Sequence, residues 1–251
     1  MLYTLDEIKT ALNRNLKLEI LNVIDSTSSE LRRRLSVSPV TAPDVLLAYG
    51  QTAGRGRQGK SFFSPSDAGI YMTLHFRAQN PAALVHLTAK AAVCVCKAIR
   101  SVTRIDAKIK WVNDIYFRDK KICGILCENI YAMSNGCSDI LVGIGINMKA
   151  VPFPKDLHNA AFIPKAEGLS AKLVAEILNR IYPSFEDLSD TTFLDDYRKL
   201  SCVLGREIFY TMNGATKSAI ATSIDQNGFL YVKHSDGSVQ CLNSGEISLK
   251  F

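Results

Sequence analysis

The sequence predicts an α+β fold, in which a large domain built on one mixed sheet precedes a small antiparallel β domain. After about residue 205, three dipeptides typical of tight hairpins, Asn213-Gly214, Asn227-Gly228 and Asp236-Gly237, separate short runs of alternating apolar and polar residues. This is the pattern of an antiparallel meander or small barrel. The residues before it mix strand-like apolar runs with helical ones. We therefore expect two domains, residues 1–201 and 202–251.

The elements of the larger domain follow from capping residues and apolar runs. Thr4 and Glu7 have the spacing of a capping box, so a short helix begins after Thr4. A second helix is expected at residues 30–35, capped by Thr27, and a long one from Asn80-Pro81 to about residue 101. Further helices are expected at residues 170–185 and 191–200, and strands at residues 17–24, 44–50, 69–76, 107–112, 114–117, 122–130 and 139–148, the last after a turn around Asn135-Gly136.

Composition excludes several classes of protein. No apolar run reaches membrane-spanning length, and the charged N-terminal residues do not resemble a secretory signal. The seven cysteines form no CxxC pair, so we expect small buried thiols in a reducing cytoplasm. The four histidines have no metal-ligand spacing, and we expect no metal site in the protein. The formal charge of +6 suits acidic substrates or an acidic protein partner, and does not by itself indicate nucleic acid.

Residues 54–59 (GRGRQG) form a basic loop that is the most informative segment of the chain. The glycine spacing matches the dinucleotide-binding pattern, which requires a helix directly after the glycines. Residues 60–66 have no helical period, so that interpretation fails. Arg55, Arg57 and Lys60 alternate with glycines, a composition that suits enclosure of an anion, although a solvated basic surface loop has the same composition.

Hydroxyl side chains are concentrated at the junction between the first predicted strand and the second predicted helix. Residues 25–30 read Asp-Ser-Thr-Ser-Ser-Glu. Helix capping explains one hydroxyl and leaves the others available to bond a ligand.

Seven motifs in order resemble those of the biotin protein ligase family. They are Asp25-Ser26-Thr27, Gln51 with residues 54–59, Ser64-Pro65, residues 110–114 (KWVND), Lys121 with Gly124-Ile125-Leu126, residues 143–147 (GIGIN) and residues 244–249 (SGEISL). Each motif alone is weak, but together they span nearly the whole chain.

The resemblance implies both a fold and a reaction. The fold is an SH2-like mixed-sheet catalytic domain, related to class II aminoacyl-tRNA synthetases, followed by an SH3-like barrel. The activity is that of a biotin–[biotin carboxyl-carrier protein] ligase. The biotin carboxylate attacks the α-phosphate of ATP to give biotinyl-5′-AMP, and a lysine of a biotin carboxyl carrier domain then takes the biotinyl group. Mg²⁺ accompanies ATP.

The resemblance also assigns site residues. The catalytic residues are Lys110, Arg55 and Asp114. Biotin is expected to contact Ser26, Thr27, Ser28, Gln51, Arg55, Gly56, Arg57, Lys110, Gly124, Ile125, Gly143 and Gly145. ATP and the adenylate are expected to contact Arg55, Arg57, Phe62, Lys110, Asn113, Lys121 and Asn147. For the glycines, strand bulges or tight packing are the structural alternative, and for Asp114 an ordinary turn.

The chain departs from the commonest family pattern at three positions. Ser28 replaces an asparagine, Val112 a proline and Phe62 a tryptophan, and none of these changes removes a charge that the mechanism needs. About two dozen residues precede Asp25, too few for the DNA-binding domain of some relatives, so we expect no DNA binding. We expect a monomer or a homodimer that partners a carrier protein and no membrane.

Three other functions remain open at this point. A lipoate or octanoate protein ligase or transferase of the same superfamily is the nearest, and the ureido-binding hydroxyls and the basic loop disfavour it. The second is a biotin-sensing nucleic-acid binder. The third is a non-catalytic subunit, which Lys110, Arg55 and Arg57 disfavour.

Overall fold

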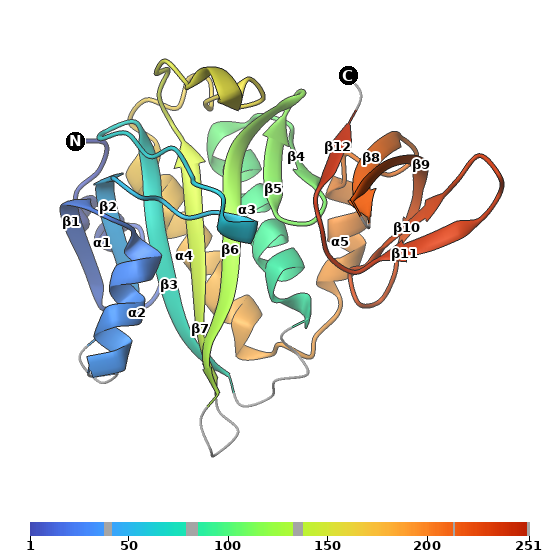
Figure 1. Ribbon diagram of the computed structural model, residues 1–251. Coiled ribbons are helices and arrows are strands. Elements are labelled where there is room, and N and C mark those ends of the chain that lie inside the picture. The colour runs from blue at the N-terminus through green and yellow to red at the C-terminus, as the bar shows by residue number, and fades with distance from the viewer. Residues whose placement is uncertain (38–41, 79–84, 133–137, 213, 250–251) are drawn as a thin grey trace.

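The computed structural model describes residues 1–37, 42–78, 85–132, 138–212 and 214–249 (Figure 1). Within these residues the larger part of the chain forms a seven-stranded sheet of order β1-β2-β3-β7-β6-β5-β4. Only β1 and β2 pair in parallel, and all other neighbours are antiparallel. The strands are β1 (Leu18–Ile24), β2 (Val45–Gln51), β3 (Gly69–Ala78), β4 (Ala107–Lys110), β5 (Asp114–Phe117), β6 (Lys120–Ala132) and β7 (Ser138–Asn147).

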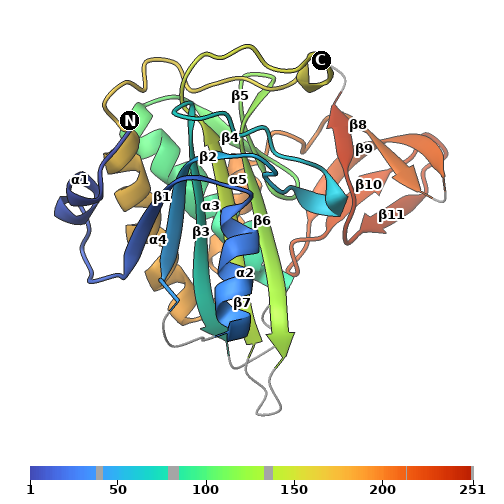
Figure 2. The ribbon, with the colours of Figure 1, turned by 60° about the vertical axis from the view of Figure 1, so that its left-hand side comes forward.

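Helices cover both faces of this sheet (Figures 1 and 2). The helices α3 (Leu87–Thr103) and α4 (Ser170–Glu186) pack together on one face, and α2 (Thr27–Val37) lies on the other. The short helices are α1 (Leu5–Thr10) and α5 (Phe193–Leu200), with single 3₁₀ turns η1 (Arg57–Gly59) and η3 (Lys155–Leu157). The mixed sheet with a separate small antiparallel sheet confirms the predicted fold class.

Apolar packing fixes α2 on the sheet. Leu31 and Leu35 of α2 form a buried cluster with Leu46 of β2 and Leu141 of β7. Burying one such side chain contributes roughly 1.5–3 kcal/mol. The position of the first turn of α2 is therefore set by residues further along the same helix.

The small domain is a five-stranded antiparallel sheet of order β11-β10-β9-β8-β12. Its strands are β8 (Glu207–Met212), β9 (Ala215–Ile224), β10 (Leu230–Lys233), β11 (Val239–Leu242) and β12 (Ile247–Leu249). The glycines of the three predicted hairpin dipeptides have φ of +77° at Gly214, +80° at Gly228 and +85° at Gly237. This left-handed conformation is what such turns require.

The turn between β9 and β10 joins the small domain to the large one. The indole Nε1 of Trp111 donates to the Gly228 carbonyl at 3.0 Å, and His86 Nε2 lies 2.9 Å from the Gln226 carbonyl. Arg198 of α5 donates to the Ile224 carbonyl at 2.8 Å and to the Asp225 carbonyl at 3.1 Å. The turn thus contacts the segment that directly follows β4.

The structure corrects two predicted boundaries. Helix α2 begins at Thr27 rather than Glu30, because the Ser26 hydroxyl accepts from the Ser29 amide at 3.4 Å and the Ser26 carbonyl already accepts from Glu30. Ser26, not Thr27, is the capping residue. The strand predicted to reach Val112 ends at Lys110, and the peptide bond between Trp111 and Val112 is cis.

Other predicted elements hold or lie outside the described residues. The capping box of Thr4 and Glu7 is present at the start of α1. The predicted helix start at Asn80-Pro81, the turn at Asn135-Gly136 and Asn213 lie outside the described residues. Helix α3 itself begins at Leu87, later than predicted, because residues 85 and 86 have 3₁₀ rather than α-helical conformation and His86 is the capping residue. No described helix is long and apolar enough to span a membrane. The six described cysteines are free thiols.

Replacing Trp111 with phenylalanine should weaken the attachment of the small domain. The indole is only 4% exposed, so the Gly228 carbonyl would be left buried without its donor. We expect a loss of about 1–3 kcal/mol in the free energy of unfolding. Urea unfolding followed by circular dichroism measures it, since Trp111 is the single tryptophan and its fluorescence is lost in the variant. An unchanged unfolding midpoint would contradict this role.

Candidate active site

A cavity of about 320 Å³ opens where the basic loop, strands β6 and β7 and the segment before β12 meet. Figure 2 shows the loop, which connects β2 to β3, extending toward the small domain. Every predicted site residue except Asn147 lines this cavity. The lining contains Ser26, Thr27, Ser28, Gln51, Arg55, Gly56, Arg57, Phe62, Lys110, Asn113, Asp114, Lys121, Gly124, Ile125, Gly143 and Gly145.

Residues 54–62, called the basic hairpin below, form a small hairpin rather than an open loop. Arg55 and Ser61 pair as an isolated bridge, and the Phe62 amide donates to the Gly54 carbonyl at 2.8 Å. The Gly56 amide donates to the Lys60 carbonyl at 2.7 Å. A side chain at Gly54 would lie 2.4 Å from the Phe62 carbonyl oxygen, so this close pairing requires glycine. No α-helix follows, which confirms that the segment is not a dinucleotide-binding turn.

The cations that line the cavity differ in what neutralises them. Three contact carboxylates: Arg55 pairs with Glu128 at 2.8 Å, Lys121 with Asp114 at 2.8 Å, and Lys60 with Glu246. Arg57 instead donates to two neutral oxygens, Asn113 Oδ1 at 3.1 Å and the Gly245 carbonyl at 3.3 Å. Lys110 lies 3.4 Å from the Tyr116 hydroxyl and 5.2 Å from the centre of its ring. Arg57 and Lys110 therefore keep charge that an anion can use.

The ammonium group of Lys110 lies in an environment that destabilises its charged form. Burial lowers its pKa below the usual value, and Lys121 nearby acts in the same direction, while Asp114 opposes both. The Tyr116 ring and hydroxyl offer partial compensation by cation–π attraction and a hydrogen bond. A partly buried cation of this kind gains more from an incoming anion than an exposed one, because water screens it less.

A continuous chain of polar groups runs from α2 across the sheet to the basic hairpin. Gln51 Oε1 accepts from the Thr27 amide at 2.8 Å, and Gln51 Nε2 donates to the Ser64 hydroxyl at 2.9 Å. Thr73 Oγ1 lies 2.8 Å from the Thr27 hydroxyl and 3.0 Å from the Ser28 hydroxyl. The chain offers donors and acceptors to a small neutral polar group at one end of the cavity.

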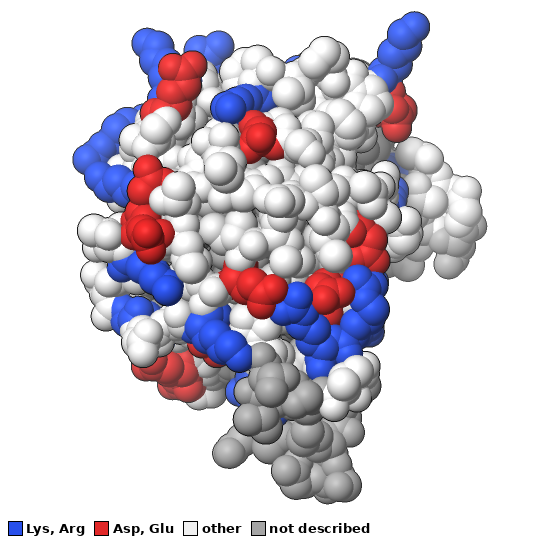
Figure 3. All heavy atoms as spheres, turned by 90° about the vertical axis from the view of Figure 1, so that its left-hand side faces the viewer, with Lys and Arg blue, Asp and Glu red and all other residues white. Residues whose placement is uncertain are grey.

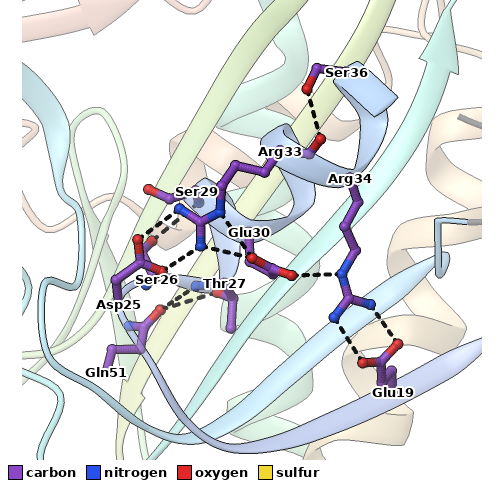
Figure 4. A network of polar contacts seen from close by, with 10 residues as sticks. All are labelled: Glu19, Asp25, Ser26, Thr27, Ser29, Glu30, Arg33, Arg34, Ser36 and Gln51. Atoms are coloured by element: carbon purple, nitrogen blue, oxygen red, sulfur yellow. Dashed lines mark hydrogen bonds and ion pairs between the residues drawn. The ribbon is translucent and has the colours of Figure 1, made fainter. Parts of the chain in front are cut away.

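Ion pairs on the outer surface hold the start of α2 in place, as Figure 4 shows. Arg33 donates with both terminal nitrogens to Asp25 at 2.8 Å, and also to Glu30. Its hydrogen bond lowers the pKa of Asp25 to about 2. Arg34 links Glu30 to Glu19 of β1. Exposed pairs contribute little to stability, but here they fix the orientation of the turn that carries Ser26 and Thr27.

The floor of the cavity is formed by two strand glycines under an aromatic ring. A side chain at Gly145 of β7 would lie 2.4 Å from the Phe62 ring, and one at Gly124 of β6 would lie 3.2 Å from it. Lys121 Nζ lies 6.0 Å from the ring centre. A side chain at Gly143 would lie 2.9 Å from the Ser28 hydroxyl, so this glycine allows α2 to approach the sheet.

Several residues of the site were not singled out from the sequence. Thr73 is fully buried, and its signal was a lone hydroxyl within the apolar run of β3. Tyr116 and Glu128 act on cations of other strands or loops, so no local spacing marks them. Glu246, which pairs with Lys60, lies within the motif at residues 244–249, but that motif did not indicate an ion pair. Conversely, Asn147 lies outside the lining. Its side-chain Nδ2 donates to the Ala161 carbonyl at 2.9 Å, and its backbone carbonyl accepts from the Ile163 amide.

Charges of both signs are mixed on one face of the molecule. On the face shown in Figure 3, blue and red side chains lie next to one another around a broad uncharged area.

The residues that the structure describes contain no group of three or more His, Cys, Asp or Glu side chains placed to hold a metal ion.

Replacing Gly145 with alanine should displace the Phe62 ring. The added methyl group would overlap the ring at 2.4 Å, a contact that forces the ring to move. We expect a loss of about 1–3 kcal/mol in the free energy of unfolding. The double variant with Phe62→Ala should recover most of this loss, as a double-mutant cycle measures. Equal and additive losses would contradict the contact.

Comparison with known proteins agrees with this geometry. Residues 20–147 match the model of the biotin/lipoate A/B protein ligase family, and residues 203–250 match that of the biotin protein ligase C-terminal domain. The bifunctional ligase/repressor BirA of Salmonella typhimurium is 30% identical, over 92% of this chain and 73% of its own length. The biotin–[acetyl-CoA-carboxylase] ligase of Mycobacterium tuberculosis is 24% identical, over 85% of this chain and 82% of its own length.

Solved structures give the same result. The biotin protein ligase of Aquifex aeolicus, in complex with biotin and ATP, superposes with a TM-score of 0.75 and 26% identity, covering 93% of this chain and 98% of that one. The family model covers more than half of the 251 residues, and the Salmonella relative is matched over most of its length. This chain therefore belongs to the biotin/lipoate A/B protein ligase family.

Proposed function

We propose that this protein is an ATP-dependent biotin protein ligase. It activates biotin as biotinyl-5′-AMP and transfers the biotinyl group to a lysine of a biotin carboxyl carrier domain. The observation that carries the proposal is the presence in one cavity of two cations with neutral partners, Lys110 and Arg57, and a polar chain suited to a ureido group. The biotin-bound and ATP-bound complex of the Aquifex relative supports it.

The first step brings a carboxylate against a triphosphate, so negative charge gathers at one point. Lys110 is proposed to lie between the biotin carboxylate and the α-phosphate, where its ammonium stabilises the charge that builds up as pyrophosphate leaves. Arg57 neutralises the phosphates, and Arg55 closes the basic hairpin over them. Phe62, Asn113 and Lys121 complete the proposed nucleotide site, and Asn147 supports it from outside through residues 161–163.

Biotin is proposed to lie across the strands. Its ureido group would bond Ser26, Thr27, Ser28 and Gln51, and its apolar tail would run past Gly124, Ile125, Gly143 and Gly145. Gly56 offers backbone groups beside the carboxylate. In the second step Asp114, at the cavity wall, orients the incoming lysine amine; before this it is bound by Lys121.

Among the described residues, no group of three or more His, Cys, Asp or Glu side chains is placed to hold Mg²⁺. The cavity carboxylates Asp114 and Glu246 are each paired with a lysine, and no acidic cluster lies nearby. We propose that Mg²⁺ enters with the nucleotide, held by phosphate oxygens. The domains are proposed as residues 1–201 for catalysis and 202–251 for the C-terminal domain. The free cysteines support a cytoplasmic location.

Replacing Lys110 with alanine should remove adenylate formation without unfolding the protein. Loss of the cation that stabilises the transition state lowers the rate by at least about 100-fold. Pyrophosphate release with biotin, ATP and Mg²⁺ measures it, and circular dichroism checks the fold. Lipoate in place of biotin separates the two family activities. Wild-type turnover in the variant would remove the role of Lys110, and pyrophosphate release with lipoate alone would overturn the choice of biotin.

The rate of adenylate formation should decrease as the pH rises, and this decrease should begin at a lower pH than it would for a lysine with an ordinary pKa. The reaction needs protonated Lys110, whose pKa is lowered by burial, so activity is lost as the pH rises through that reduced value. Replacing Tyr116 with phenylalanine removes the hydroxyl but keeps the ring, which destabilises the charged form further. We therefore expect the alkaline limb of the pH profile to move to lower pH. A Lys110→Arg variant with measurable activity should lack this limb, and an unshifted limb in the Tyr116 variant would contradict the contact.

A further inference from the structure

Glu128 of β6 holds two arginines that come from different parts of the chain. Its Oε2 accepts from Arg55 Nη1 at 3.1 Å and its Oε1 from Arg55 Nη2 at 2.8 Å, a two-point ion pair. The same Oε1 accepts from Arg32 Nη2 of α2 at 2.9 Å. The Glu128 side chain is 16% exposed and that of Arg55 is 38% exposed, so the pair is partly shielded from water.

Glu128 is not among the residues that line the cavity. A carboxylate beside the phosphates would repel them, and outside the lining it acts on a cation without touching an anionic ligand. Two-point contacts between arginine and a carboxylate also restrict the direction of the guanidinium. The pair therefore fixes where Arg55, and with it one arm of the basic hairpin, can lie.

We propose that Glu128 is a positioning residue that holds the basic hairpin, residues 54–62, over the cavity before any ligand binds. Arg55 is its point of attachment on the hairpin. The other arm is held independently, through the contacts of Arg57 with Asn113 and Gly245 and of Lys60 with Glu246. The proposal deepens the proposed function, and rests on it for its kinetic consequence.

The arrangement separates two tasks between the two loop arginines. Arg55 is paired with Glu128 and serves to anchor the hairpin, whereas Arg57 faces neutral oxygens and keeps its charge for the ligand. A hairpin held down in advance loses less conformational freedom when the ligand binds. It also excludes water from a reactive acyl-adenylate until the second substrate arrives.

Arg32 provides a matched control. It contacts the same Glu128 oxygen as Arg55 but belongs to α2, which Leu31 and Leu35 already fix on the sheet. If Glu128 serves only to form ordinary surface ion pairs, Arg32→Gln and Glu128→Gln should have similar effects on the stability of residues 54–62. If it anchors the hairpin, only the Glu128 change should free residues 54–62.

The first experiment measures hydrogen exchange in the ligand-free protein and does not depend on the enzymatic activity. The amides of Gly56 and Phe62 report hairpin opening, because both donate within it. In Glu128→Gln we expect these amides to exchange at least about 5-fold faster, and in Arg32→Gln within about 2-fold of wild type. Unchanged exchange in Glu128→Gln, or equal acceleration in both variants, overturns the proposal.

The second experiment measures the proposed reaction in the same variants. Glu128→Gln should raise KM for biotin and speed dissociation of preformed biotinyl-5′-AMP by about 5-fold or more, with kcat for pyrophosphate release within about 2-fold. A loss of kcat alone overturns the positioning role. If wild type releases no pyrophosphate, the proposed function fails, whereas the exchange result still decides whether Glu128 holds the hairpin. Equal melting temperatures of the two variants exclude general unfolding.

Discussion

The architecture of the site depends on keeping positive side chains close together in a partly buried cavity. Five cations line one space, and their mutual repulsion has to be balanced within the protein. The balance is uneven: Arg55, Lys60 and Lys121 each contact a carboxylate, while the contacts of Arg57 and Lys110 with described residues are to neutral oxygens or an aromatic ring. These two groups mark where negative charge is favoured.

This balance draws on elements from the whole chain. The carboxylates come from β5, from β6 and from the segment before β12, and the basic hairpin spans the distance between them. The polar chain through Thr27, Gln51 and Thr73 sets the opposite end of the cavity. The seven-stranded sheet gives these groups fixed relative positions because its central strands are covered on both faces.

Local patterns in the sequence were sufficient to predict much of the fold and of the candidate site. The hairpin glycines, the capping box at Thr4 and the exclusion of a dinucleotide turn all depend on neighbouring residues, and the structure agrees with each. The predicted cap of α2 was wrong by one residue, because Ser26 and Thr27 both suit that position in the sequence. Only the folded structure shows that Thr27 bonds Gln51 instead. Glu128 and Tyr116 were missed because their partners lie on other strands or loops.

The contact between Trp111 and the turn after β9 has a consequence for how the two sheets can be separated. The indole is buried against Gly228, and the residue directly before it is Lys110. Cutting the chain ahead of β8 would leave a large aromatic surface bare beside the reaction centre, together with carbonyl-binding groups on His86 and Arg198 that lose their acceptors. A truncated large domain would thus expose this apolar surface to water and be prone to aggregation.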